Sequence, residues 1–119
     1  MIIEGPAEPE LAAQIIQALP ETHAIPVRSI PLNLLAAVME QSGAFIGNDS
    51  GIAHLAAALD VPSIVLFGPT LPQHWAPLGK RVIVLKNPSG CEGCASGGSD
   101  HTCLGNIAVH EVIRKYKDL

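Results

Sequence analysis

The segment AFIGNDSGIAHLAAALDVPSIVLF, residues 44–67, decides the fold because it reads as a strand, a helix and a second strand in succession. Ala44–Gly47 is a short apolar run, and Ser63–Phe67 is an unbroken apolar run, as expected of a strand covered on both faces. Between them, Ile52–Leu59 is rich in helix-forming residues and is followed by Asp60-Val61-Pro62, which stops a helix. This alternation favours parallel strands joined by a helix.

The segments on both sides continue the alternation. Further strands are expected at Ile2–Ile3, Ala24–Val27 and Val82–Leu85, and further helices at Glu10–Leu19, Leu34–Met39 and Val109–Lys117. The proline-rich segment 68–79 and the segment of glycine, serine and cysteine that runs to residue 105 are expected to be loops. The sequence therefore predicts an α/β fold with a Rossmann-like, doubly wound and mostly parallel sheet.

Composition limits the class of protein. The 119 residues are 48% apolar and 15% charged, which fits one globular domain, residues 1–119, and excludes a disordered acidic tail. No apolar run reaches the roughly 18 residues of a membrane helix and no basic leader opens the chain, so we expect a cytoplasmic protein. Seven basic residues against eleven acidic ones predict no binding to nucleic acid.

Two of the expected strand ends carry residues that packing does not require. Asn48–Gly51 follows the first strand of the deciding segment and Gly68–Thr70 follows the second, where a doubly wound sheet binds its ligands. Backbone N–H groups at a helix start attract anions, and Gly51 permits close approach. His54 lies one turn further on the same helix face. The pattern indicates a phosphate or diphosphate site, although it also suits a simple helix cap.

The run from Ile46 to Thr70 resembles the signature of the heptosyltransferase family, the ADP-heptose:lipopolysaccharide glycosyltransferases of family 9, which have a two-domain GT-B fold. The similarity continues through Trp75, Pro77 and Gly79 and reaches Cys103–Leu104. It implies that this chain is the C-terminal, donor-binding half of an inverting glycosyltransferase. Such an enzyme would transfer heptose, or a similar sugar, from an ADP-sugar to the lipopolysaccharide core.

The resemblance also implies roles for individual residues. Glu8 lies in a turn that resembles the Gly-x-x-Glu turn of the family, and would contact the ribose or base of the nucleotide. The residues expected at the diphosphate and sugar are Asp49, Ser50, Gly51, His54, Gly68 and Thr70. The family is generally metal-independent, so no cofactor is expected and the ADP-sugar is the substrate.

Relative to the family pattern, the acceptor-binding N-terminal domain is missing, as are the first strand of the donor domain and its lysine. We therefore expect the chain alone to be inactive. It would form a homo-oligomer or associate with a separate chain that carries the N-terminal domain. That domain would provide the lipopolysaccharide acceptor site and any peripheral contact with the inner face of the membrane.

The cysteine-bearing segment contains residue types that bind zinc or an iron–sulfur centre. The four candidate ligands are Cys91, Cys94, His101 and Cys103. Related heptosyltransferases commonly carry one more cysteine here, which this sequence lacks, so we expect free thiols in place of a metal site. An odd number of cysteines in a cytosolic protein also disfavours a disulfide framework.

Two other functions remain open at this stage. The chain would serve as a non-catalytic nucleotide-binding or assembly module if no acceptor domain joins it. A sugar-nucleotide 2-epimerase shares the GT-B architecture, but it would need further carboxylates and a histidine around a uridine diphosphate, which this sequence does not place.

Overall fold

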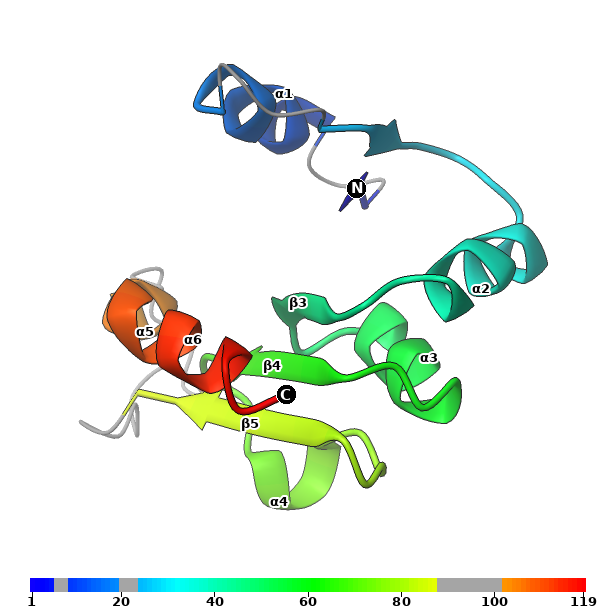
Figure 1. Ribbon diagram of the computed structural model, residues 1–119. Coiled ribbons are helices and arrows are strands. Elements are labelled where there is room, and N and C mark those ends of the chain that lie inside the picture. Colours follow the sequence, from blue (N-terminus) through cyan, green and yellow to red (C-terminus); the bar gives the residue numbers. More distant parts are fainter. Residues whose placement is uncertain (6–8, 20–23, 88–101) are drawn as a thin grey trace. The chain divides into compact units, whose positions relative to one another are not determined.

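The computed structural model describes residues 1–5, 9–19, 24–87 and 102–119 (Figure 1). The chain divides into two compact units, Met1–Leu35 and Ala36–Leu119. All strand pairs are parallel, so the predicted parallel α/β fold is confirmed.

The first unit pairs two short strands beside one helix. Strands β1 (Ile2–Ile3) and β2 (Pro26–Val27) are parallel, and helix α1 (Pro9–Gln17) lies between them in the chain. Two backbone hydrogen bonds between these segments are donated from the β1 side. Ile2 N donates to Ile25 O, and Glu4 N, directly after β1, donates to Val27 O. Pro26 has no N–H, and this register does not require one.

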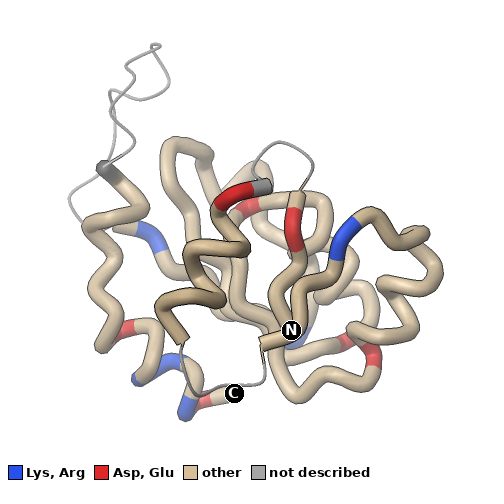
Figure 2. The backbone as a smooth tube through the Cα atoms, turned by 90° about the horizontal axis from the view of Figure 1, so that it is seen from above, with Lys and Arg blue, Asp and Glu red and all other residues tan. Residues whose placement is uncertain are grey.

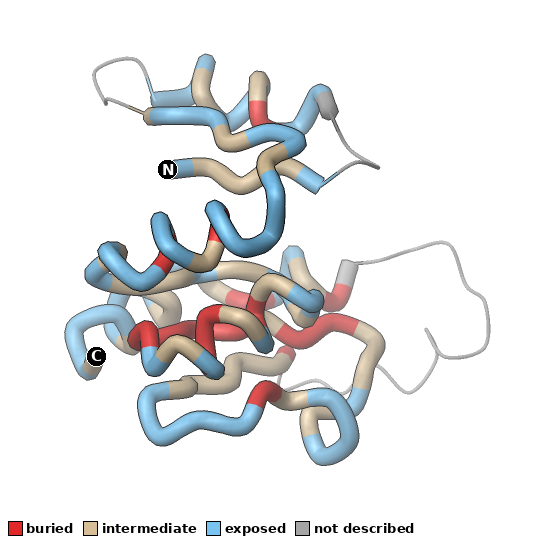
Figure 3. Tube along the Cα trace, turned by 90° about the vertical axis from the view of Figure 1, so that its right-hand side faces the viewer, coloured by how far each residue is buried: buried red, intermediate tan, exposed pale blue. Residues whose placement is uncertain are grey.

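The second unit is built on a three-stranded sheet of order β3-β4-β5. Its strands are β3 (Phe45–Asn48), β4 (Ser63–Phe67) and β5 (Val82–Lys86). The central strand β4 is buried almost throughout, as the apolar residues that follow Ser63 predict (Figure 3). Ser63, its one polar member, is satisfied because its hydroxyl donates to Val61 O at 2.7 Å.

The remaining elements are helices. They are α2 (Leu32–Glu40), α3 (Gly51–Ala58), α4 (Pro72–Trp75), α5 (Thr102–Gly105) and α6 (Val109–Tyr116). Helix α3 contacts β3 and β4, and α6 contacts β4. The longest described helices have nine residues, about half the length that a bilayer requires, and none of the described helices can span a membrane.

The core of the second unit forms where α3 meets the sheet. Ala53 of α3 packs with Val65 and Phe67 of β4, and Phe45 of β3 packs against this cluster. Alternate residues of β4 point to opposite faces, and Ile64 is also fully buried, so both faces of the strand are covered. This rigid centre holds the carboxyl ends of β3 and β4 in place.

Two short helices differ from the sequence prediction. Segment 68–79, expected as a loop, contains the single turn α4, and residues 102–105, also expected as a loop, form α5. In α4 the N–H groups of His74 and Trp75 both donate to Leu71 O. Each helix is only four residues long, too short to show a helical period in the sequence.

Candidate functional site

The carboxyl ends of β3 and β4 lie side by side. Asn48 pairs with Leu66, and the ladder continues one residue further because Asp49 N donates to Leu66 O at 3.1 Å. The loop after β3 therefore starts next to the end of β4. The structure thus brings together the two strand-end segments that the sequence analysis singled out, at the edge where parallel sheets bind ligands.

A side-chain hydrogen bond joins these two segments. The hydroxyl Oγ1 of Thr70 donates to Oδ2 of Asp49 at 2.8 Å, and both residues are half-buried. An ionised carboxylate only accepts hydrogen bonds, so the proton in this bond comes from the threonine. The expected site residues Asp49 and Thr70 are thus direct partners, a pairing that the sequence analysis did not include.

The N-terminus of α3 is open and has free donors. Ser50, the N-cap residue, has extended backbone angles (φ −158°, ψ 165°), and its side chain makes no capping hydrogen bond. The first N–H groups bonded back to Ser50 O are those of Ala53 and His54, at 3.0 and 3.4 Å. Within the described residues, the N–H groups of Gly51 and Ile52 therefore have no helical partner.

The simple capping interpretation is not what the structure shows. Ser50 does not cap the helix with its side chain, and the carboxylate of Asp49 is bonded to Thr70. Apart from its chain neighbours and the helix backbone, a β-carbon built on Gly51 would meet no described atom within 4 Å, so this side of Gly51 is open. His54 is exposed and lies one turn from Gly51. The arrangement is suited to an anion that approaches along the helix axis.

Gly68 differs from the other expected site residues because it is buried. A β-carbon at Gly68 would stand 3.2 Å from Cys103 Sγ and 3.2 Å from Leu104 Cγ, both in α5. A larger residue here would require these side chains to move by a few tenths of an ångström, so glycine suits the close packing of α5 on the loop after β4. A direct contact between Gly68 and a ligand stays a prediction.

Several predicted residues lie outside the described part of the chain. They are Glu8, Cys91, Cys94 and His101. Cys103 is described, and it is a buried free thiol. Among the described residues, no group of three or more His, Cys, Asp or Glu side chains is placed to hold a metal ion.

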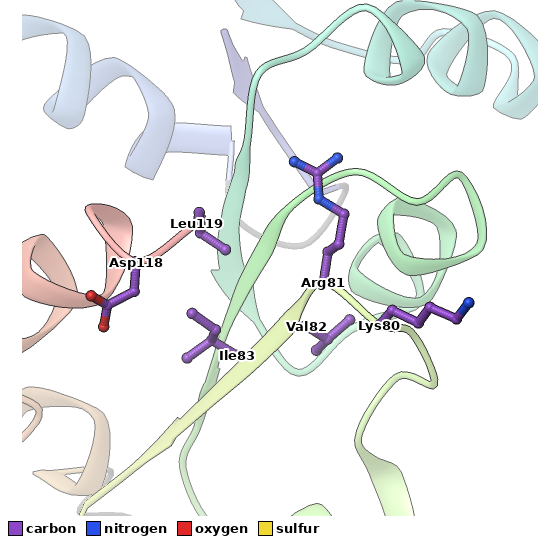
Figure 4. Close-up of a pocket in the computed structure, with 6 residues that line it drawn as sticks. All are labelled: Lys80, Arg81, Val82, Ile83, Asp118 and Leu119. Atoms are coloured by element: carbon purple, nitrogen blue, oxygen red, sulfur yellow. The ribbon is translucent and has the colours of Figure 1, made fainter.

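A cavity of about 180 Å³ lies at the opposite end of the sheet, beside the start of β5 (Figure 4). Its lining includes Lys80, Arg81, Asp118 and Leu119. The side chains of Lys80 and Arg81 point away from each other (Figure 4), and Arg81 Nη1 instead donates to Asp60 O at 3.4 Å. The charged groups that line this cavity do not converge on one point. None of the residues after β3 or β4 that form the candidate site is among its lining residues.

The charged residues of the described chain are dispersed (Figure 2). The basic end of α6 is partly neutralised by its own acidic neighbours. Arg114 lies 3.8 Å from Glu111, and Lys115 lies 3.4 Å from Asp118. These pairs reduce the positive potential of the helix.

The family model described as glycosyltransferase family 9 (heptosyltransferase) matches residues 2–104. The chain belongs to this family. It is 35% identical over 88 residues to lipopolysaccharide heptosyltransferase 1 of Pseudomonas aeruginosa, an alignment that covers 74% of this chain and 24% of that protein. The match to family 9 confirms the resemblance seen in the sequence.

Solved structures of the family share the fold. The glycosyl transferase family 9 protein of Veillonella parvula is 28% identical, with a TM-score of 0.81, and the match covers 98% of this chain and 34% of that one. The ADP-heptose lipopolysaccharide heptosyltransferase II of Escherichia coli is 25% identical, with a TM-score of 0.80 and the same coverage. The family 9 chain thus spans about a third or less of the length of these relatives.

Proposed function

We propose that this chain is the donor-binding part of a glycosyltransferase that transfers heptose, or a similar sugar, from an ADP-sugar to the lipopolysaccharide core. Membership of family 9 and the names of its relatives support the reaction class and the substrates. The observation that carries donor binding is the N-terminus of α3, where the amides of Gly51 and Ile52 have no partner among the described residues, next to the bonded pair of Asp49 and Thr70.

The diphosphate of the donor fits the start of α3. The N–H groups of Gly51 and Ile52 would donate to its oxygens, and the positive end of the helix dipole would favour its charge. His54, exposed one turn further, would add a donor. The same groups would stabilise the nucleoside diphosphate as it departs, because negative charge develops on it as the glycosidic bond to the sugar breaks. No metal is required for this role.

Asp49 fits the sugar better than the diphosphate. Two anions side by side repel, whereas a carboxylate readily accepts a hydrogen bond from a sugar hydroxyl. Thr70 occupies Oδ2, and among the described residues Oδ1 has no hydrogen-bond donor. Glu8 is proposed to face the ribose or base, as the family resemblance implies.

The acceptor site is proposed to lie outside this chain, because the chain spans about a third or less of its relatives. The chain by itself would bind donor without transferring sugar. The acceptor part would come from a longer polypeptide or a separate chain, would bind the lipopolysaccharide core, and would place the enzyme at the cytoplasmic face of the inner membrane. Within the described residues β3 pairs with β4.

Calorimetric titration of the chain with ADP, and in parallel with UDP, tests the proposal. We expect ADP to bind with a Kd between about 1 μM and 1 mM, or about −8 to −4 kcal/mol, and more tightly than UDP. The variant Asp49→Ala, His54→Ala should bind ADP-heptose at least about tenfold more weakly. Lys80→Ala is the matched control, because Lys80 lies at the other end of the sheet, and it should bind as the parent chain does.

A chain that is folded by circular dichroism and gives no heat with ADP, UDP or ADP-heptose would overturn donor binding. The assembly-module alternative would then be favoured. Equal losses in the double variant and in Lys80→Ala would place the nucleotide away from α3. Tighter binding of UDP than of ADP would argue against an ADP-sugar donor and in favour of a uridine-dependent enzyme.

A further inference from the structure

We propose that Thr70 is a positioning residue of the donor site, which acts by holding the carboxylate of Asp49 and not by touching the diphosphate. This inference rests on the proposed function, and it changes the role that the sequence suggested for Thr70. It is carried by the one side-chain hydrogen bond between the segments after β3 and β4, from Thr70 Oγ1 to Asp49 Oδ2 at 2.8 Å.

The direction of this bond determines which further hydrogen bonds the Thr70 hydroxyl can make. A hydroxyl has one proton and two lone pairs. The carboxylate of Asp49 takes the proton, so the hydroxyl can only accept a further hydrogen bond. The oxygens of a diphosphate also only accept. Thr70 therefore cannot donate to the diphosphate while it is bonded to Asp49.

The backbone around Thr70 is well fixed, which a positioning residue requires. Phe67, the last residue of β4, is fully buried in the core. Gly68 is packed against Cys103 and Leu104 of α5, and Pro69 has a restricted backbone. The hydroxyl thus projects from a short segment that is anchored on its N-terminal side, and it reaches Asp49 in the neighbouring loop.

Holding Asp49 has a consequence for the ligand. A carboxylate rotates readily about its terminal bond, whose preference is broad. With Oδ2 held by Thr70, the carboxylate keeps Oδ1 available to a sugar hydroxyl. Without Thr70 it would turn freely, and in some orientations it would approach the diphosphate and repel it. Repulsion of the diphosphate would affect ADP and the nucleotide sugar alike, but only the nucleotide sugar would also lose the hydrogen bond from its sugar hydroxyl to Oδ1. The loss of Thr70 should therefore weaken binding of the nucleotide sugar more than binding of ADP.

Calorimetric titration of four chains with ADP and with ADP-heptose tests this inference. The chains are the parent, Thr70→Val, Thr70→Ser and Asp49→Ala, compared with the double variant Asp49→Ala, Thr70→Val. Valine has the shape of threonine without the hydroxyl, whereas serine keeps it. We expect Thr70→Val to weaken ADP-heptose binding about tenfold, as for a hydrogen bond to a charged group, and ADP binding by less. Thr70→Ser should bind within about twofold of the parent.

The double variant separates positioning from direct contact. If Thr70 acts through Asp49, Thr70→Val should cost little once Asp49 is alanine, so the two effects should not add. Thermal unfolding of each chain identifies losses that come from misfolding, and Thr70→Ala, which also lacks the hydroxyl, replaces Thr70→Val in the comparison if the valine variant unfolds.

The outcomes of these titrations separate a failure of the proposed function from a failure of the role proposed for Thr70. Absence of binding of either ligand to the folded parent chain overturns the proposed function, and the role of Thr70 with it. Normal binding by the parent together with unchanged binding by Thr70→Val overturns only the role of Thr70. Full additivity in the double variant, or an equal loss of ADP and ADP-heptose, would instead make Thr70 a direct ligand contact and overturn positioning.

Discussion

The sulfur of Cys103 lies 3.2 Å from the point that a β-carbon would occupy on Gly68. Cys103 is 2% exposed, so its thiol fills space above the loop that follows β4. Two residues after Gly68, Thr70 reaches across to Asp49. The packing of α5 thus supports the same short segment that contributes to the candidate donor site.

Gly68→Ala should destabilise the second unit, because the added methyl group must displace the side chains of Cys103 and Leu104. We expect the free energy of unfolding to fall by about 1–3 kcal/mol, measured by urea denaturation. Gly43→Ala is the control, since a β-carbon there meets nothing within 4 Å, and it should be neutral or slightly stabilising.

A second variant identifies the cause. Combining Gly68→Ala with Cys103→Ala should cost less than the sum of the two single changes, because the smaller alanine at 103 makes room for the methyl group. Strict additivity would mean that Gly68 and Cys103 are not in contact in solution.

The thiol of Cys103 should be protected from reagents. In a chain with Cys91→Ser and Cys94→Ser, Cys103 is the remaining thiol, and it is buried where α5 packs against the loop after β4. We expect its reaction with a disulfide reagent to be about 100-fold slower in buffer than in urea, because reaction requires local opening. A native rate equal to the urea rate would show that α5 is undocked.

The ring of Phe45 explains the glycine two residues further along β3. A β-carbon at Gly47 would lie 2.5 Å from Phe45 Cζ, so the ring rests over Gly47 on the same face of the strand. Gly47→Ala should therefore destabilise the fold by about 1–3 kcal/mol in urea denaturation. Part of this loss should be recovered when Phe45→Leu is added, although that change alone also weakens the core. No recovery would contradict the contact.

Much of the fold could be predicted from particular residues. The strand Ser63–Phe67 has the predicted boundaries because an unbroken apolar run suits only the covered centre of a sheet. The helix predicted at Ile52–Leu59 is observed at Gly51–Ala58, shifted by one residue, since Ser50 is the N-cap. Helix α1 ends at Gln17, two residues before the predicted end, with Ala18 and Leu19 still hydrogen-bonded to the last turn.

Two features of the candidate site could not be predicted, because they depend on contacts between segments that are distant in the sequence. Sequence placed Asp49 and Thr70 at neighbouring strand ends, but their hydrogen bond depends on the register of β3 against β4 and on the path of each loop. The sequence suggested Gly68 as a ligand contact. Its packing against α5 could not be predicted, because this helix has only four residues and shows no helical period in the sequence. Local patterns carry no information on such pairings.

Gly51→Ala should separate binding from stability, because position 51 opens α3 and faces empty space. Alanine is a better helix former and a β-carbon there clashes with no described atom, so the thermal midpoint should stay or rise slightly. The same β-carbon would stand beside the amides to which the diphosphate is proposed to bind, so we expect ADP to bind about fivefold to tenfold more weakly by calorimetry. Gly43→Ala, also in open space but away from α3, should leave ADP binding unchanged. Unaltered ADP affinity in Gly51→Ala would mean that the diphosphate does not lie against this helix end.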